Sequence, residues 1–166
     1  MLDSLSNIFK ITELRNKILY TLMMFAVFRA GIHIPVPGVD ASVIESLFTS
    51  GNLFGLLDLF AGGALSKFSI FAMSITPYIN ASIIMQLLQA VVPQFEAWSK
   101  DGEDGRKKIA KVTRYGTVVL GFVQAAGMAF ALRANNALVN NDFLSVFVVA
   151  IILTAGTCLL MWIGEQ

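Results

Sequence analysis

An apolar stretch over residues 53–92 limits most strongly what this chain can fold into. The stretch is too long for one membrane crossing, because a hydrocarbon core of roughly 30 Å needs only about 20 helical residues. A glycine pair followed by Ser66 and Lys67 interrupts it. It therefore predicts a short apolar half-helix at about 53–61, a bend, and then a full span over 68–92.

A half-helix that re-enters the bilayer beside a full helix indicates a pore or a transport path. Irregular backbone is tolerated at membrane depth only where protein buries it or a water-filled cavity receives it. The composition agrees, because 56% of the residues are hydrophobic and 14% are charged, against about 25% charged in an ordinary soluble domain. We expect an all-α polytopic membrane helix bundle.

Three further apolar segments, 18–34, 113–132 and 143–163, complete a set of four predicted spans. Residues 1–17 contain too short an apolar run to form a span. They fit an amphipathic helix on the cytoplasmic membrane surface, or a frayed terminal arm.

Two polar segments connect these spans. Residues 35–52 are expected to form an external loop in which Asp40 N-caps a short helix. Residues 93–112 are expected to form a cytoplasmic loop whose basic run next to a span is more often a topology anchor than a binding site for nucleic acid or anionic lipid.

The orientation follows from the distribution of basic residues. Three of the 12 precede the first span, five lie between the second and third, and a sixth, Arg114, is the second residue of the third span. The positive-inside rule then places the N-terminus and the 93–112 segment in the cytoplasm. Arg29 lies within the first span near its end, where snorkelling or helix packing is favoured over a functional intramembrane charge.

Ile75, Ile79 and Ile83 share one helical face, since they are one turn apart. Their spacing alone favours ordinary packing or lipid contact. A sharper interpretation is a hydrophobic constriction, which gates a pore and limits ion leakage. Pro77 lacks a backbone donor, so a kink near Ser74 is expected.

Enzymatic functions find no support in the motifs. The chain has no HExxH, GxSxG or P-loop pattern. Its single histidine, His33, cannot form a His-rich metal site, and its single cysteine, Cys158, excludes an intramolecular disulfide. We expect no catalytic residue, cofactor or metal.

Four further segments identify a family: FRAGIHIPVPGVD (28–40), DLFAGGALSKFSIFAMSITPYINASIIMQLL (58–88), DGEDGRKKIAKVTRYGT (101–117) and LMWIGEQ (160–166). They closely resemble the bacterial SecY family, the channel subunit of the Sec protein translocase. The resemblance covers nearly the whole chain, in order.

The resemblance implies roles for three sets of residues. Residues 53–66 would be the plug that closes the channel from outside, and Ile75 and Ile79 would belong to the pore ring. The 68–92 and 113–132 helices would form one side of the lateral gate. The implied plug residues are Leu53, Phe54, Leu56, Leu57, Leu59, Phe60, Ala61, Gly62, Gly63, Ala64 and Leu65, and the implied gate residues are Asn80, Ile83, Gln86 and Gln124.

The resemblance also implies partners and a location. The partners would be the SecE and SecG subunits, the SecA motor ATPase, the ribosome, a translocating polypeptide with its signal sequence, and the lipid bilayer of the bacterial cytoplasmic membrane. SecY proteins have ten spans, so four spans form only the N-terminal portion, which should not conduct polypeptide alone. The competing classes are a secondary transporter, which needs a convergent polar pocket at the midplane, and a scaffold in a membrane complex.

Overall fold

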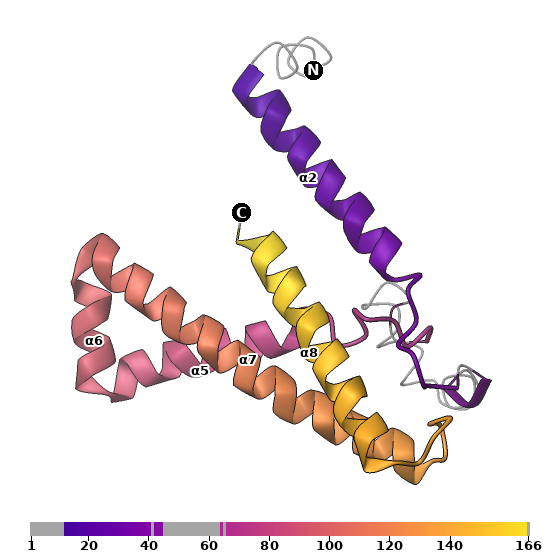
Figure 1. Ribbon diagram of the computed structural model, residues 1–166. Coiled ribbons are helices and arrows are strands. Elements are labelled where there is room, and N and C mark those ends of the chain that lie inside the picture. Colours follow the sequence, from indigo (N-terminus) through magenta and orange to yellow (C-terminus); the bar gives the residue numbers. More distant parts are fainter. Residues whose placement is uncertain (1–11, 41, 45–63, 65, 166) are drawn as a thin grey trace.

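The computed structural model describes residues 12–40, 42–44, 64 and 66–165. Within these ranges the chain is mostly helical, as predicted. Two isolated antiparallel bridges, Pro35–Ser69 and Val39–Leu138, join its connecting segments. The helices are α2 (Thr12–Gly31), α5 (Thr76–Val91), α6 (Pro93–Lys100), α7 (Gly102–Ala134) and α8 (Phe143–Gly164) (Figure 1).

The first helix includes part of the predicted surface segment. The prediction of a separate helix over residues 1–17 is wrong for residues 12–17, which continue directly into α2. The Glu13–Lys17 ion pair (3.2 Å) and the bond from Thr21 Oγ1 to the Lys17 carbonyl (2.9 Å) bridge the expected junction. The rest of that segment lies outside the described residues.

The helix of the central stretch begins later than predicted. Residues 66–75, called here the bend segment, form successive turns, and α5 begins only at Thr76. Phe68 and Ser74 have φ values of 43° and 51°, in the left-handed region that a right-handed helix cannot include. Pro77 lies in the first turn of α5, where its missing N–H is not needed. It therefore opens the helix and does not kink it.

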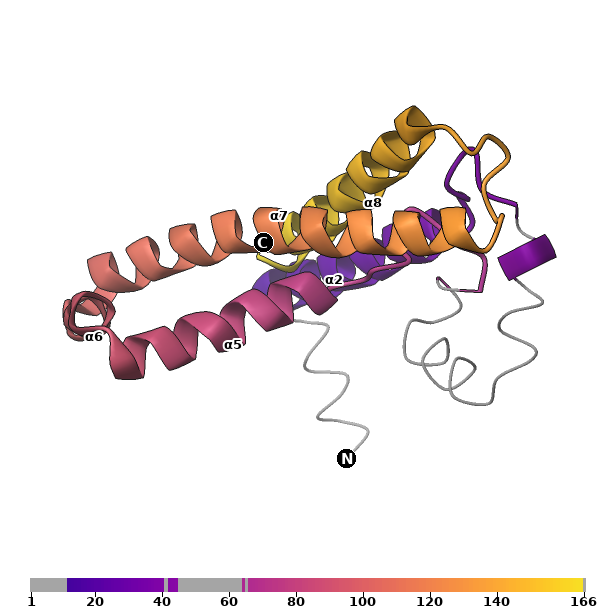
Figure 2. The same ribbon diagram turned by 90° about the horizontal axis from the view of Figure 1, so that it is seen from below.

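The predicted 93–112 loop is largely helical, which corrects its expected irregular structure. It contains α6 and the start of α7, and Figure 2 shows α6 closing the end of two arms, α5 and α7. The turn between α6 and α7 requires glycine at two positions. Gly102 has a φ of 69°, and a Cβ on Gly105 would lie 1.7 Å from the Trp98 carbonyl oxygen.

The two connections at the opposite end of the bundle contact each other. The Asp40 N–H donates to the Ala137 carbonyl (2.8 Å), and the Val139 N–H donates to the Gly38 carbonyl (3.0 Å). This pairing fits the expectation that both connections lie on one side of a membrane. Asp40 also accepts bonds from the Ser42 N–H (2.9 Å) and hydroxyl (2.6 Å), which confirms its predicted capping of a short helix.

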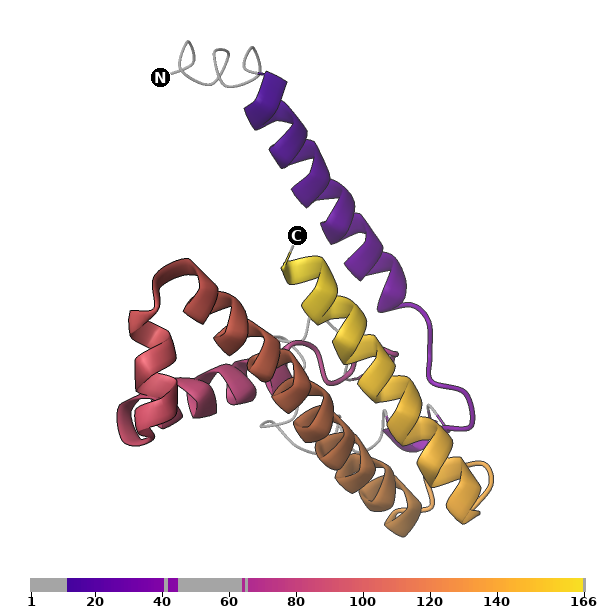
Figure 3. The same cartoon turned by 60° about the vertical axis from the view of Figure 1, so that its left-hand side comes forward.

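The core lies mainly between α7 and α8, which converge toward the connection that joins them (Figure 3). Small residues on α7 face branched residues on α8, so the two backbones approach closely. Ala125 and Ala129 on α7, and Val149 and Leu153 on α8, are at most 1% exposed. Gly121 brings α7 against both Pro77 of α5 and Thr154 of α8.

Two helices in the described ranges, α7 and α8, are long and apolar enough to cross a membrane. With 16 residues, α5 is shorter than a usual span. α2 carries Glu13, Arg15, Lys17 and Arg29 within 20 residues. Length and composition therefore support two of the four predicted crossings, and the other two remain predictions.

Candidate functional site

The bend segment is held by backbone hydrogen bonds to the residues that follow α2. The Val36 N–H donates to the Phe68 carbonyl (3.0 Å), and the Ile70 N–H donates to the Ile34 carbonyl (3.1 Å). Between them Ser69 is fully buried, and its hydroxyl accepts a bond from the Phe71 N–H (3.2 Å). Buried backbone groups are thus paired without a regular helix, as a stable irregular segment requires.

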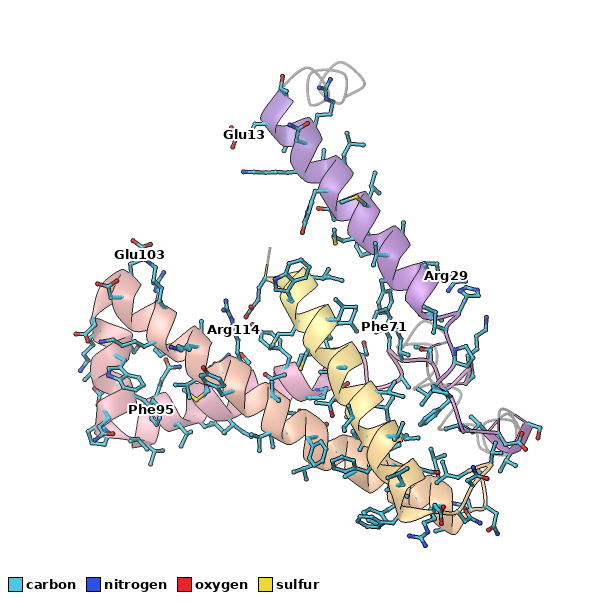
Figure 4. All side chains as sticks on the ribbon, viewed as in Figure 1. Glu13, Arg29, Phe71, Phe95, Glu103 and Arg114 are labelled. Atoms are coloured by element: carbon cyan, nitrogen blue, oxygen red, sulfur yellow. The ribbon has the colours of Figure 1, made fainter. Side chains whose placement is uncertain are left out.

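Phe71 anchors the bend segment against α2. Its ring is 2% exposed and stacks on Phe28, with the ring centroids 5.7 Å apart. A Cβ built on Gly31 would lie 2.0 Å from Cε2 of this ring, so the contact requires glycine there. Figure 4 shows Phe71 between the end of α2 and α8.

The second anchor is on α8. A Cβ built on Gly156 would lie 2.0 Å from the carbonyl oxygen of Ile70 and 2.9 Å from its carbonyl carbon. Gly156 is buried, and the atoms that it contacts belong to the backbone. The bend segment therefore lies between a glycine of α2 and a glycine of α8.

Ile75, the last residue of this anchored segment, and Ile79 and Ile83 of α5 are called here the isoleucine face. Their exposed fractions are 46%, 45% and 49%. The buried residues of α5 are Pro77, Ala81 and Met85, each two positions away and so about 200° around the helix. The predicted shared face is confirmed, and it points away from the contact with α7. Its role as a pore ring stays a prediction.

Ile75 also lines a groove between α2 and α8 with a volume of about 890 Å³. Apolar and aromatic side chains make up much of its wall, including Phe28 and Leu160. Glu13 and Lys17 lie at the groove and pair with each other. The sequence of α5 contains no charged residue, so the isoleucine face carries no charge of its own.

The predicted gate residues lie on the two helices expected for them. Asn80, Ile83 and Gln86 are on α5, and Gln124 is on α7. The two helices run antiparallel, because Gly116 faces Ala81 and Gly121 faces Pro77. This register places Gln124 near the level of Ser74, about six residues and thus ~9 Å along the axis from Asn80. α5 and α7 are therefore packed side by side, but the gate role is not tested by this packing.

The predicted plug lies almost wholly outside the described residues. Residues 53–63 and 65 are not among the described residues, so the half-helix proposed for 53–61 stays a prediction. Ala64 is described, and it is fully buried. Its carbonyl accepts a bond from the Ser69 N–H (2.9 Å), so the end of the predicted plug is joined to the bend segment.

Apart from the Glu13–Lys17 pair at the groove, two further charged pairs lie on α6, α7 and the residue after α8. Arg114 Nε of α7 lies 2.7 Å from Glu165 Oε2 just beyond α8, and Figure 4 shows Arg114 reaching toward that end of α8. The Lys100 ammonium lowers the pKa of the Glu96 carboxyl by a hydrogen bond and by its charge. The described residues contain no group of three histidine, cysteine or acidic side chains placed to hold a metal ion.

Sequence reasoning missed Gly31, Phe71, Gly156 and the Arg114–Glu165 pair. A glycine in the apolar run of α8 was an available signal, because glycine weakens a helix relative to alanine and therefore indicates a need for space. The ion pair had no local signal, since its two residues are far apart in the sequence.

Comparisons with known proteins point to one family. A family model described as SecY matches residues 69–166. The protein translocase subunit SecY of Halalkalibacterium halodurans is 53% identical over 171 residues, which cover 100% of this chain and 39% of the relative. The corresponding subunits of Bacillus subtilis and Staphylococcus aureus are 52% and 47% identical, again over the whole chain, with 39% and 40% of their own lengths covered. The chain spans about two fifths of the length of these curated relatives.

Proposed function

Because the chain belongs to the SecY family, we propose that it forms the N-terminal part of a protein-conducting channel in the bacterial cytoplasmic membrane. The complete channel passes unfolded secretory polypeptides across the membrane and releases membrane segments sideways into lipid. The observation that carries this proposal is the uncharged, half-exposed isoleucine face, held next to the anchored bend segment in a chain of this family.

The mechanism is passive. Ile75 and Ile79 belong to a ring of branched aliphatic side chains that fits loosely around an extended polypeptide and excludes water and ions when the channel rests. Residues 53–66 form the plug that fills this constriction from outside, and the bond from the Ser69 N–H to the Ala64 carbonyl joins the end of the plug to the bend segment. The chain has no catalytic residue in this mechanism.

The lateral gate has one wall in α5 and the apolar part of α7, with Asn80, Ile83, Gln86 and Gln124 along it. A signal sequence reaches lipid through this wall. The antiparallel packing of α5 against α7 supports the proposal, because it places these two helices side by side in one wall.

The proposed topology has four crossings, with the N-terminus and α6 in the cytoplasm. The pairing of residues 38–40 with 137–139 supports it, since both connections then lie outside. SecE and SecG complete the membrane complex, and SecA or a translating ribosome supplies the energy from the cytoplasmic side.

The test is to measure ion leak through resting full-length channels with Ile75→Gly and Ile79→Gly combined. A several-fold rise per assembled channel is expected, because removal of both side chains widens and wets the constriction. Ile84→Gly is the matched control, since Ile84 is 44% exposed on the same helix but lies off the isoleucine face. Equal leak from the double variant and the control contradicts the ring assignment.

Cross-linking separates a channel from a small-solute transporter. A channel with Ile75→Cys should cross-link to a secretory chain stalled during export, whereas Ile84→Cys should not. Absence of the Ile75→Cys product, although the variant still assembles in the membrane, favours the transporter or scaffold classes.

A further inference from the structure

We propose that Gly31 and Gly156 are positioning residues that fix the isoleucine face by clamping the bend segment from two sides. This inference rests on the proposed function. The resting channel excludes water and ions, which is called here the resting seal. The inference assigns part of this seal to two residues that do not belong to the isoleucine face.

The first contact leaves no room for a side chain. A methyl group on Gly156 would lie 2.0 Å from the Ile70 carbonyl oxygen, well inside van der Waals contact. The obstacle is backbone, so no side-chain rotation relieves it. Either α8 or the bend segment must move.

α8 is the more regular of the two, since it is one continuous helix of 22 residues. Leu153 and Thr157, on either side of Gly156, are 0% and 2% exposed, and Leu153 belongs to the core formed with α7. Close-packed cores transmit displacement and do not absorb it. The bend segment also contributes Phe68, Ala72 and Met73 to this core, but its backbone is a series of turns, so we expect it to take up the shift.

Short hydrogen-bonded turns connect the clamp to the isoleucine face. The Ala72 N–H donates to the Ser69 carbonyl (2.8 Å), and the Ser74 N–H donates to the Phe71 carbonyl (2.8 Å). The Ile79 N–H then donates to the Ile75 carbonyl (3.0 Å), which continues the connection into α5. A displacement of Ile70 is thus carried to Ile75 over five residues.

The second contact acts on the next residue from the opposite helix. A methyl group on Gly31 would lie 2.0, 2.6 and 2.8 Å from three atoms of the buried Phe71 ring. Here the obstacle is a side chain, so a smaller residue at 71 relieves it. The two glycines therefore make different, separable predictions.

Other helical glycines provide matched controls. A methyl group on Gly121 would meet Pro77 at 3.7 Å, an ordinary contact, and one on Gly127 would meet nothing within 4 Å. Alanine at either position is expected to leave the bend segment in place. Both controls lie on α7, a predicted span like α8.

The experiment measures resting ion leak per assembled full-length channel in Gly31→Ala, Gly156→Ala, Gly121→Ala and Gly127→Ala. A several-fold increase is expected for the first two and none for the last two. Phe71→Leu should restore the resting seal in the Gly31→Ala background but not in the Gly156→Ala background. A general loss of folding does not produce this selective rescue.

The outcomes separate this inference from the proposed function. If Ile75→Gly with Ile79→Gly raises leak but Gly31→Ala and Gly156→Ala behave like the controls, the clamp is wrong and the ring stands. If none of these variants leaks, both fail. Should Gly156→Ala not accumulate, the Gly31→Ala leak and its rescue by Phe71→Leu decide the question.

Discussion

Single residues with special backbone or hydrogen-bonding needs determine the irregular parts of this chain. Phe68 and Ser74 adopt left-handed φ values and so end any helix before α5. Asp40 begins the short helix of the connection after α2 with its carboxylate, and the Ser42 hydroxyl and N–H both donate to one of its oxygens. That carboxylate lies beside the pairing of residues 38–40 with 137–139.

The Asp40 contact predicts a measurable titration. The Ser42 hydroxyl, followed by the Ser42 N–H, holds the pKa of the Asp40 carboxyl below its usual value. A lowered folded-state pKa means that the contact stabilises the fold above the unfolded-state pKa and loses this effect as pH falls through the folded-state value. Ser42→Ala should raise the Asp40 pKa toward the ordinary value, as followed by carboxyl NMR.

The matched variant is Ser42→Thr, which keeps a hydroxyl at the same position. It should leave the Asp40 pKa low. If Ser42→Ala also leaves it low, the hydroxyl is not the main cause of the shift.

At the scale of the elements, an ion pair ties α7 to the end of α8. Arg114 and Glu165 are 2.7 Å apart, with side chains 54% and 19% exposed. Glu165 lies where the negative end of the α8 dipole disfavours an acid, so the arginine offsets an unfavourable position. The pair brings together two helices at the end opposite their covalent connection.

Removing this pair should destabilise the channel modestly. Exposed pairs contribute about 0.2–1 kcal/mol, so Arg114→Gln should lower the free energy of unfolding by up to about 1 kcal/mol. Because Glu165→Gln also removes the unfavourable dipole contact, a double-mutant cycle with both variants is needed to isolate the interaction free energy between Arg114 and Glu165. Thermal unfolding in detergent measures this interaction free energy, and high salt should reduce it.

Glu103→Gln is the control, because its partner Lys107 is 3.4 Å away and both side chains are more than two thirds exposed. Coupling no larger than in the Glu103–Lys107 pair would contradict a specific tie between α7 and α8.

At the scale of the whole molecule, the positions of several helices were predictable from the sequence. The contacts between segments that are distant in the sequence were not. Apolar runs indicated α8 and the apolar part of α7, and the polar break at Ser66 and Lys67 indicated an interrupted segment. The helices over 93–100 and 102–112 were missed because charged residues and glycines are also typical of loops. Glu96 and Lys100 were an available signal, since they form a helical i,i+4 pair. The bend segment depends on Gly31 and Gly156, which are distant in sequence and act only once α2 and α8 are placed.

The molecular arrangement also predicts which sites are reachable from each side of the membrane. In full-length channels with Cys158→Ser, Asn140→Cys should react with a membrane-impermeant thiol reagent added outside intact cells. Gln94→Cys on α6 should react only after the membrane is opened. Both positions are exposed in the structure, so the opposite pattern would reverse the proposed orientation.

α7 runs without interruption through all 33 of its residues. At 1.5 Å per residue it is about 50 Å long, whereas the hydrocarbon core is roughly 30 Å thick. In the proposed topology α7 is therefore about 20 Å longer than the layer that it crosses. Its charged residues other than Arg133 lie between Glu103 and Arg114, so the surplus length falls in the part of α7 that follows α6.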